Sequence, residues 1–210
     1  MKRIFLIRHG ETEWNRAGRF QGQRDVPLSD LGRRQAMAVA EVLSSVPFRR
    51  VVASSLSRAV ETARPLADRL GLAVEPVEAF KEIGHGDWEG MTAAEVERRH
   101  PGAVERWHTC PGEVTMPGGE SLSDVSARAW PAFLSLFEDD RDPAALFIHD
   151  AVLKVILCNI LAAPLGSFWR FQIANGSVTV AEMGPKGLRI ALMGYTAGED
   201  LLSRPEQKGL

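Results

Sequence analysis

Residues 4–15 read Ile-Phe-Leu-Ile-Arg-His-Gly-Glu-Thr-Glu-Trp-Asn, and this stretch decides the fold. Its four leading apolar residues have the length and side chains of a buried strand. The strand ends at Arg8, His9 and Gly10. In an open α/β sheet, ligands bind at the carboxyl ends of the strands. Arg8 is a fixed cation suited to phosphate or carboxylate, and His9 can act as a nucleophile, a base or a metal ligand.

The rest of the chain alternates between strand-like and helix-like segments. Ser29 and Ser57 are predicted to cap two helices, and Gly71 is predicted to end the second. Such alternation is typical of an α/β fold, so we expect a three-layer sandwich with a mainly parallel sheet flanked by helices. The predicted strands span residues 4–7, 51–53, 74–77, 145–148, 178–181 and 188–192, and the longer helices span 30–43, 58–70, 122–137 and 152–161.

The length of 210 residues predicts a single domain over 1–210. Prolines and glycines crowd residues 101–119, which favours an excursion of loops rather than core structure. We therefore place a loop or helix lid at about 91–120, inserted into the domain.

Composition excludes several classes of function. Hydrophobic residues make up 45% of the chain and charged residues 25%, which is ordinary for a soluble globular protein. A net charge of -2 lacks the excess of basic residues that is typical of a nucleic-acid-binding protein. No apolar stretch is long enough to cross a membrane. Cys110 and Cys158 lie far apart and form no Cys-x-x-Cys motif. Together with a start that lacks a signal-peptide core, this predicts a cytoplasmic protein.

Polar groups follow three of the predicted strands. Arg8 and His9 end the first, Ser54 and Ser55 end the second with Arg58 one turn further on, and His149 ends a later one. The ends of parallel strands should converge, which would place two arginines and two histidines around one pocket. Such a pocket suits a dianion, because arginine forks match phosphate oxygens. A lone histidine at a strand end is more often structural, and the functional interpretation depends on all three ends together.

These residues are similar to a known family. Residues 8–12, Arg-His-Gly-Glu-Thr, closely resemble the signature of the histidine phosphatase superfamily, the phosphoglycerate mutase-like proteins, and the extended signature is satisfied through Asn15. The resemblance continues, in the family's order, through residues 18–22, 27–32, 54–59, 82–84, 88–90, 117–121 and 149.

The resemblance implies a mechanism for phosphoryl transfer. His9 would attack phosphorus and become a phosphohistidine, and the neighbouring Arg8 and Arg58 would favour its neutral ring. Arg8, Arg58 and His149 would hold the three non-bridging oxygens in the transition state. No metal and no other cofactor would be needed, because the protein supplies the cations.

The resemblance assigns further roles by position. Asn15 and the turn at Gln21 and Gly22 would add hydrogen bonds to the phosphate. Glu82 would protonate the leaving alkoxide and then activate water, and a nearby phosphate charge should raise its pKa. The structural alternative for Glu82 is a solvated loop glutamate.

One position departs from the family pattern. The family's last histidine is usually followed by glycine, whereas Asp150 follows His149 here. Asp150 either points away from the pocket and holds a neighbouring arginine, or repels the dianion. We expect His85 to be an exposed loop histidine, and His108, in the predicted lid, to be a surface group and a candidate substrate contact.

The motifs leave three activities open. A metal-independent phosphomonoesterase acting on small phosphorylated metabolites is favoured, because the chain is short for a mutase and residues 91–116 contain no tyrosine or lysine. A cofactor-dependent phosphoglycerate mutase is the alternative, and a non-catalytic relative that binds a phosphorylated ligand is another. A metallohydrolase is disfavoured by the lack of His-x-His or His-Glu-x-x-His spacing. Homodimers occur in the family, so a homodimer is also consistent with the resemblance.

Overall fold

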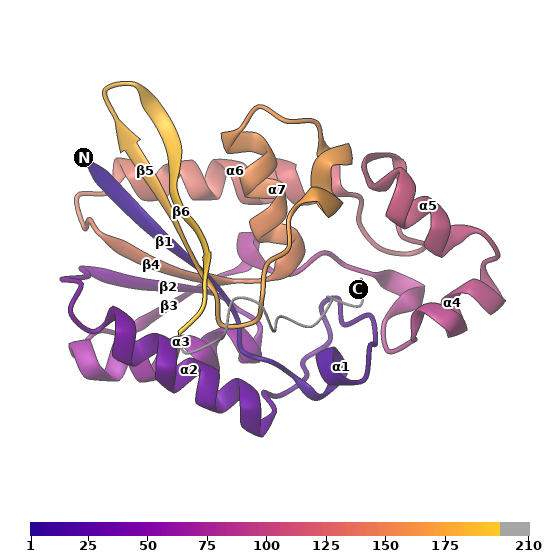
Figure 1. Ribbon diagram of the computed structural model, residues 1–210, viewed down its shortest axis with the longest axis horizontal. Helices are drawn as coiled ribbons and strands as arrows, with labels where there is room; N and C mark the ends of the chain where they lie inside the picture. The colour runs from indigo at the N-terminus through magenta and orange to yellow at the C-terminus, as the bar shows by residue number, and fades with distance from the viewer. Residues whose placement is uncertain (198–210) are drawn as a thin grey trace.

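The computed structural model describes residues 1–197 and contains one six-stranded sheet (Figure 1). Its strand order is β3-β2-β4-β1-β5-β6. The first four of these run parallel, β5 is antiparallel to β1, and β6 is antiparallel to β5, so the prediction of a mainly parallel sheet is confirmed. The strands are β1 Lys2–Arg8, β2 Arg50–Ser54, β3 Val74–Val77, β4 Ala144–Ile148, β5 Val178–Gly184 and β6 Gly187–Tyr195.

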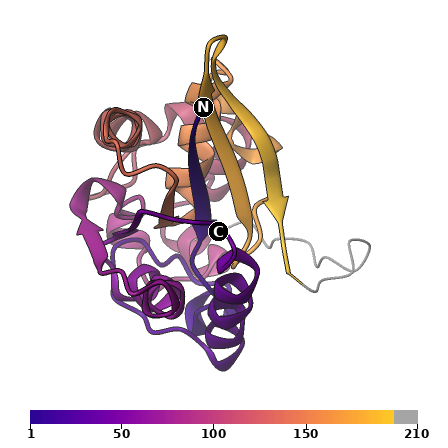
Figure 2. The same ribbon diagram turned by 90° about the vertical axis from the view of Figure 1, so that its left-hand side faces the viewer.

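Helices cover both faces of the sheet, as the sandwich prediction requires. In Figure 1, α6 and α7 lie above the sheet and α2 and α3 lie below it, while Figure 2 shows the β5–β6 hairpin at one edge. The helices are α1 Glu13–Arg16, α2 Asp30–Leu43, α3 Ser57–Leu70, α4 Ala93–Arg99, α5 Ala103–Thr109, α6 Leu122–Glu138 and α7 Asp150–Ile160. Short 3-10 turns are η1 Glu78–Phe80, η2 Gly86–Trp88, η3 Pro111–Glu113 and η4 Leu165–Arg170.

The apolar pattern of β1 explains why helices must cover both faces of the sheet. Ile4 and Leu6 belong to the core cluster shared with α6 and α7, whereas Ile7 belongs to the cluster shared with α2 and α3. Successive side chains of a strand point to opposite faces, so a continuous apolar run is the signature of a strand buried on both sides. This double burial fixes β1 at the centre of the sheet and delivers its last residues to the carboxyl edge.

Two of the three predicted helix signals are confirmed. Ser29 caps α2, with its Oγ accepting from Gly32 N at 3.1 Å, and Gly71 ends α3 in the left-handed conformation. The prediction of Ser57 as the cap of α3 is wrong, because Leu56 occupies the cap position and Ser57 already lies in the helix. The Asp25 carboxylate replaces the missing cap by accepting from Ser57 N at 2.9 Å.

The segment of residues 91–120, here the lid segment, is more ordered than its composition predicts. It contains α4, α5 and η3, and it lies beyond the carboxyl ends of the strands (Figure 1). The expectation of loops over residues 101–119 is wrong in part, because Trp107 and Met116 are fully buried in the core. The breakers sit at element boundaries: Gly102 precedes α5 in the left-handed conformation, and Pro111 begins η3.

The single-domain prediction includes residues 198–210, which lie outside the described residues. Within residues 1–197, no helix is both long and apolar enough to cross a membrane.

Candidate active site

The two histidines at the strand ends lie next to each other. Arg8 pairs with Ile148 in the register between β1 and β4, so His9 and His149 leave adjacent strands at the same level. Their ring centroids are 5.0 Å apart with an interplanar angle of 61°. Ser54, at the end of the neighbouring β2, lies 2.7 Å from His149 Nε2 through its Oγ. The structure therefore brings together the ends of three parallel strands.

The hydrogen bond of the His9 ring fixes its tautomer. His9 Nδ1 lies 2.7 Å from the Gly10 carbonyl oxygen. A carbonyl can only accept, so Nδ1 carries the proton and Nε2 keeps its lone pair. Burial holds the pKa of His9 well below its ordinary value, and the charges of Arg58 and Arg8 lower it further. His9 is thus a neutral imidazole with an unprotonated Nε2, which is the form that a nucleophile requires.

Gly10 is required by packing against the first turn of α2. A Cβ at Gly10 would lie 2.4 Å from the carbonyl oxygen of Gly32. The Gly10 N–H donates to Thr62 Oγ1 at 3.0 Å, and Thr62 Oγ1 in turn donates to the Arg58 carbonyl at 2.6 Å. Sequence reasoning missed Thr62, although its position one helical turn after Arg58 places both on one face of α3.

The protein fixes one terminal nitrogen, Nη1, of the Arg8 guanidinium. Its Nη1 donates to the Ile173 carbonyl and lies 3.2 Å from Asp150 Oδ1. Its Nε is buried and has no hydrogen-bond partner among the described residues. A buried donor of this kind is costly unless a ligand or water accepts from it, so Nε is a candidate contact for an anionic ligand.

Arg58 repeats this arrangement from α3. Its Nη1 donates to the Arg24 carbonyl at 2.8 Å and its Nη2 donates to the Gly22 carbonyl at 2.8 Å. The Nε is again buried without a partner in the described part of the chain. Burial lowers the pKa of Arg58 to about 10, so the guanidinium stays charged at neutral pH. Gly22 therefore contributes its carbonyl to the position of Arg58.

His149 contacts Ser54 through one ring nitrogen and leaves the other buried without a partner among residues 1–197. Ser54 Oγ accepts from Leu56 N at 3.3 Å and lies 2.7 Å from His149 Nε2, to which it can donate its own proton. His149 Nδ1 is buried and has no partner in residues 1–197, and it carries the ring proton when Ser54 donates to Nε2. Burial, followed by the Arg58 charge, lowers the pKa of His149 well below its usual range, so the ring is neutral.

Glu82 is buried beside this group rather than solvated. Its Oε1 accepts from Ile83 N at 2.9 Å, and its Oε2 lies 3.5 Å from Ala151 N at the start of α7. Burial raises the pKa of Glu82, and the Asp150 charge raises it further, while Arg58 and Arg8 act in the opposite direction. The shift has the expected direction, and its source in the free protein is burial rather than phosphate.

An arginine that no motif indicated fixes the backbone of Glu82. Arg128 on α6 donates to the Glu82 carbonyl at 3.0 Å through Nη2 and pairs with Glu120 at 2.7 Å through Nε. Glu120 also accepts from Gly84 N at 2.7 Å. Nothing in the local sequence indicates this clamp, because its parts come from separate segments of the chain.

Asn15 and Gln21 belong to one hydrogen-bond network around Thr12. Thr12 Oγ1 donates to Asn15 Oδ1 at 3.0 Å and accepts from Gln21 Nε2 at 2.6 Å. Asn175, which sequence reasoning missed, donates to the His9 carbonyl at 3.0 Å. The roles of Asn15, Gln21 and Gly22 as phosphate contacts stay predictions.

The prediction of an exposed His85 is wrong. His85 is buried, with its ring edge-on to Phe20 at 5.0 Å and to Trp107 at 6.3 Å between centroids. Burial lowers its pKa to about 4, so it is neutral at physiological pH. His108 is exposed, as expected, and its ring packs edge-on against Trp169.

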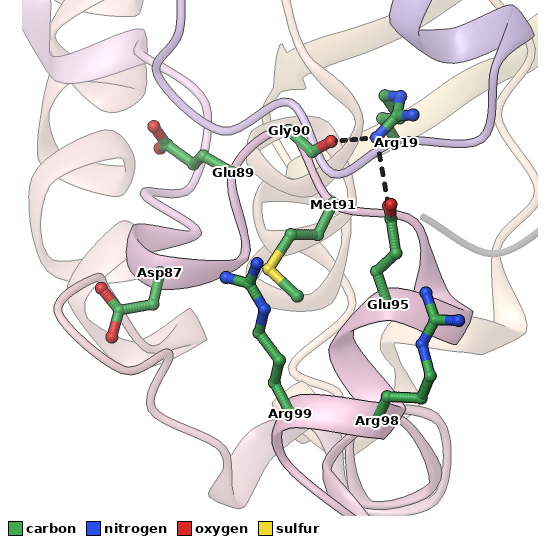
Figure 3. A pocket seen from close by; sticks show the side chains of 8 residues that line it. All are labelled: Arg19, Asp87, Glu89, Gly90, Met91, Glu95, Arg98 and Arg99. Atoms are coloured by element: carbon green, nitrogen blue, oxygen red, sulfur yellow. Dashed lines mark hydrogen bonds and ion pairs between the residues drawn. The ribbon is translucent and has the colours of Figure 1, made fainter.

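A pocket of about 450 Å³ opens where the lid segment meets the loop around Arg19. Figure 3 shows Arg19 donating to the Gly90 carbonyl and to Glu95, with Arg98 and Arg99 extending from α4. The histidines, Arg8, Arg58 and Glu82 do not line it. No group of three or more His, Cys, Asp or Glu side chains suited to a metal ion occurs within residues 1–197.

The paired histidines, the two arginines and the buried carboxyl gather at the carboxyl edge of the sheet in an α/β sandwich. The model of the histidine phosphatase superfamily (branch 1) matches residues 4–196, and the chain belongs to this family. A glucosyl-3-phosphoglycerate phosphatase from Mycolicibacterium vanbaalenii is 37% identical over 176 residues, covering 80% of this chain and 78% of that protein.

Two further relatives agree with this assignment. Phosphoserine phosphatase 1 from Hydrogenobacter thermophilus is 33% identical over 184 residues, which cover 87% of each chain. The solved structure of mycobacterial glucosyl-3-phosphoglycerate phosphatase with VO3 superposes with a TM-score of 0.84 at 32% identity, covering 94% of this chain and 100% of the other.

Proposed function

We propose that this protein hydrolyses phosphate monoesters of small metabolites through a phosphohistidine on His9. One observation carries the proposal: the bond from Nδ1 to the Gly10 carbonyl leaves an unprotonated Nε2 on His9, in a site where Arg8 Nε, Arg58 Nε and His149 Nδ1 are buried without partners among residues 1–197. Three donors match the three non-bridging oxygens of a phosphoryl group. Relatives that act on glucosyl-3-phosphoglycerate and phosphoserine support a small phosphorylated substrate.

In the first step, the Nε2 lone pair of His9 forms a bond to phosphorus. The bond between phosphorus and the ester oxygen breaks, and its electron pair stays on that oxygen, which takes the proton of Glu82. The alcohol leaves, and the phosphoryl group remains on His9. Arg8, Arg58 and His149 stabilise the charge spread over the phosphoryl oxygens in the transition state.

In the second step, the Glu82 carboxylate takes a proton from water as the water oxygen attacks phosphorus. The P–N bond breaks and its electron pair returns to Nε2, which releases phosphate and restores the protonated Glu82. The cations of this mechanism are arginines, so we propose turnover without a metal.

The first test is phosphate release from 4-nitrophenyl phosphate in the presence of chelator, with His9→Ala as the comparison. We expect the native protein to turn over and His9→Ala to lose at least about a thousandfold of the rate, because it lacks the nucleophile. Equal rates would reject the role of His9, and full inhibition by chelator would reject the metal-independent mechanism.

The mutase alternative predicts a different partition of the same phosphohistidine. A mutase returns the phosphoryl group to an acceptor substrate, whereas a phosphatase transfers it to water. Measuring phosphate release beside isomerisation of a phosphoglycerate separates the two, and isomerisation that outpaces hydrolysis would favour the mutase.

A cytoplasmic location is part of the proposal, and fractionation of the native host tests it.

A further inference from the structure

Asp150 is a buried carboxylate between two cations. It begins α7 directly after His149, and it is only 5% exposed. Its Oδ2 lies 2.8 Å from Lys154 Nζ, and its Oδ1 lies 3.2 Å from Arg8 Nη1. Lys154 is itself 1% exposed and stands one helical turn further along α7. Because buried charges are costly unless paired, this arrangement requires all three groups.

The contact with Arg8 orients the guanidinium toward the site. Nη1 is fixed both by the Ile173 carbonyl and by Asp150, while Nε remains without a protein partner in the described residues. A guanidinium is planar and rigid, so fixing one of its nitrogens sets the direction of the other donors. The contact between Arg8 Nη1 and Asp150 Oδ1 has the distance of an ion pair. It is not a hydrogen bond, and Asp150 Oδ1 accepts none from the described residues.

Asp150 also lies close to the carboxyl of Glu82. The Glu82 Oε2 is 3.5 Å from the amide nitrogen of Ala151, the residue after Asp150, and the Asp150 charge acts on the Glu82 carboxyl. The charged groups that face Glu82 are Asp150 from α7, Arg58 from α3 and Arg8 from β1. Among these, Asp150 alone favours the protonated carboxyl, because a like charge disfavours ionisation.

Lys154 offsets the negative charge of Asp150. Its ammonium pairs with Asp150 and lies 4.8 Å from the Phe168 ring centroid and 4.7 Å from that of Trp169. Aromatic faces stabilise a cation without neutralising it. The Asp150–Lys154 pair is therefore close to neutral toward a distant phosphate, while Asp150 remains the nearer charge to Arg8.

We propose that Asp150 is a positioning residue of the phosphatase site, which orients Arg8 and places a negative charge beside the Glu82 carboxyl. The inference rests on the proposed function for its role in catalysis. Of the two alternatives that the sequence left open, it selects the aspartate that holds an arginine.

The test uses protein labelled with ¹³C at the glutamate side-chain carboxyls, with Glu82→Gln to assign the resonance. Asp150→Asn preserves shape and removes the charge, so we expect the Glu82 titration midpoint to fall. Lys154→Met is the matched control, because it removes the other buried charge of the same pair and should not lower the midpoint. An unchanged midpoint in Asp150→Asn, or a fall in both variants, would overturn the proposal.

This measurement needs no turnover, so failure of the proposed function leaves it valid. Where native protein hydrolyses phosphate esters, the alkaline limb of kcat/KM for an alkyl phosphate should move to lower pH in Asp150→Asn and not in Lys154→Met. If Asp150→Asn unfolds, the double variant with Lys154→Met removes both charges of the pair, and its Glu82 midpoint should still fall below that of Lys154→Met alone.

Discussion

The indole N–H of Trp169 donates to the carbonyl of Trp107 at 2.7 Å, and this bond joins η4 to α5 of the lid segment. The two rings also meet edge-on, with centroids 5.6 Å apart. Trp169 in turn faces Lys154, so the lid segment and the Asp150–Lys154 pair are supported by the same aromatic residue. The lid segment is thus anchored to the layer that carries the site.

Replacing Trp169 with Phe keeps a ring in place and removes this donor. We expect the free energy of unfolding to fall by about 1 kcal/mol, the usual value of one hydrogen bond in a half-buried position. Urea denaturation measures the change. Trp130→Phe is the control, because Trp130 stacks on Phe133 and its indole N–H makes no hydrogen bond within residues 1–197. Equal losses of unfolding free energy in the two variants would show that the hydrogen bond from Trp169 to Trp107 is not the cause of the change.

The tautomer of His9 is testable without substrate. Long-range ¹H–¹⁵N correlation spectra of the imidazoles, with His9→Asn for assignment, should show His9 neutral and protonated on Nδ1. The pKa of His9 is held well below its ordinary value by burial first and by the two arginines second. The signal should therefore not change as the pH falls through 6.5, the ordinary pKa of histidine. A midpoint near that value, or a proton on Nε2, would contradict the nucleophile assignment.

Glu82→Gln should affect poor leaving groups more than good ones. An alkoxide needs the proton of Glu82, whereas 4-nitrophenolate leaves without one. For an alkyl phosphate we expect kcat/KM to fall by about 10² to 10⁴, the usual contribution of general acid catalysis, and for 4-nitrophenyl phosphate much less. Because kcat/KM reports on steps up to formation of the phosphohistidine, the comparison isolates the first step. Equal losses for both esters would reject Glu82 as the acid.

The same variant should be more stable than the native protein at neutral pH. The pKa of Glu82 is raised in the folded state, chiefly by burial. The folded state therefore binds more protons than the unfolded chain, and stability falls as the pH rises from the unfolded pKa through the folded one. Glutamine removes this loss. We expect Glu82→Gln to have a higher melting temperature at pH 7 and no advantage at pH 4, and a destabilised variant at pH 7 would contradict the argument.

The sequence predicted best what depends on short segments. The apolar run before Arg8 and the glycine after His9 were enough to predict the strand, its edge and the residues delivered there. Arg128 was not predictable, because its clamp on the Glu82 backbone depends on how α6 packs against a distant loop. His85 was misjudged for the same reason: its burial comes from Phe20 and from Trp107 in the lid segment, which its neighbours in sequence do not reveal.

Ser54 offers a test of how the second histidine is set. Its Oγ lies 2.7 Å from His149 Nε2 and accepts from Leu56 N, and we expect its proton to direct the His149 proton to Nδ1. Ser54→Ala removes that constraint and lets the neutral ring adopt the other tautomer, whose Nδ1 repels a phosphoryl oxygen. We expect kcat to fall about tenfold, equivalent to about 1.4 kcal/mol.

The effect should appear in kcat more than in KM, because the donor matters most when charge develops on the phosphoryl oxygens. Ser55→Ala is the matched control, since it removes a hydroxyl one residue along and leaves the contact with His149 intact. Imidazole spectra of Ser54→Ala should show the His149 proton distributed over both nitrogens while His9 stays protonated on Nδ1. A variant with native kcat and a redistributed His149 proton would show that His149 does not donate to the phosphoryl group through Nδ1.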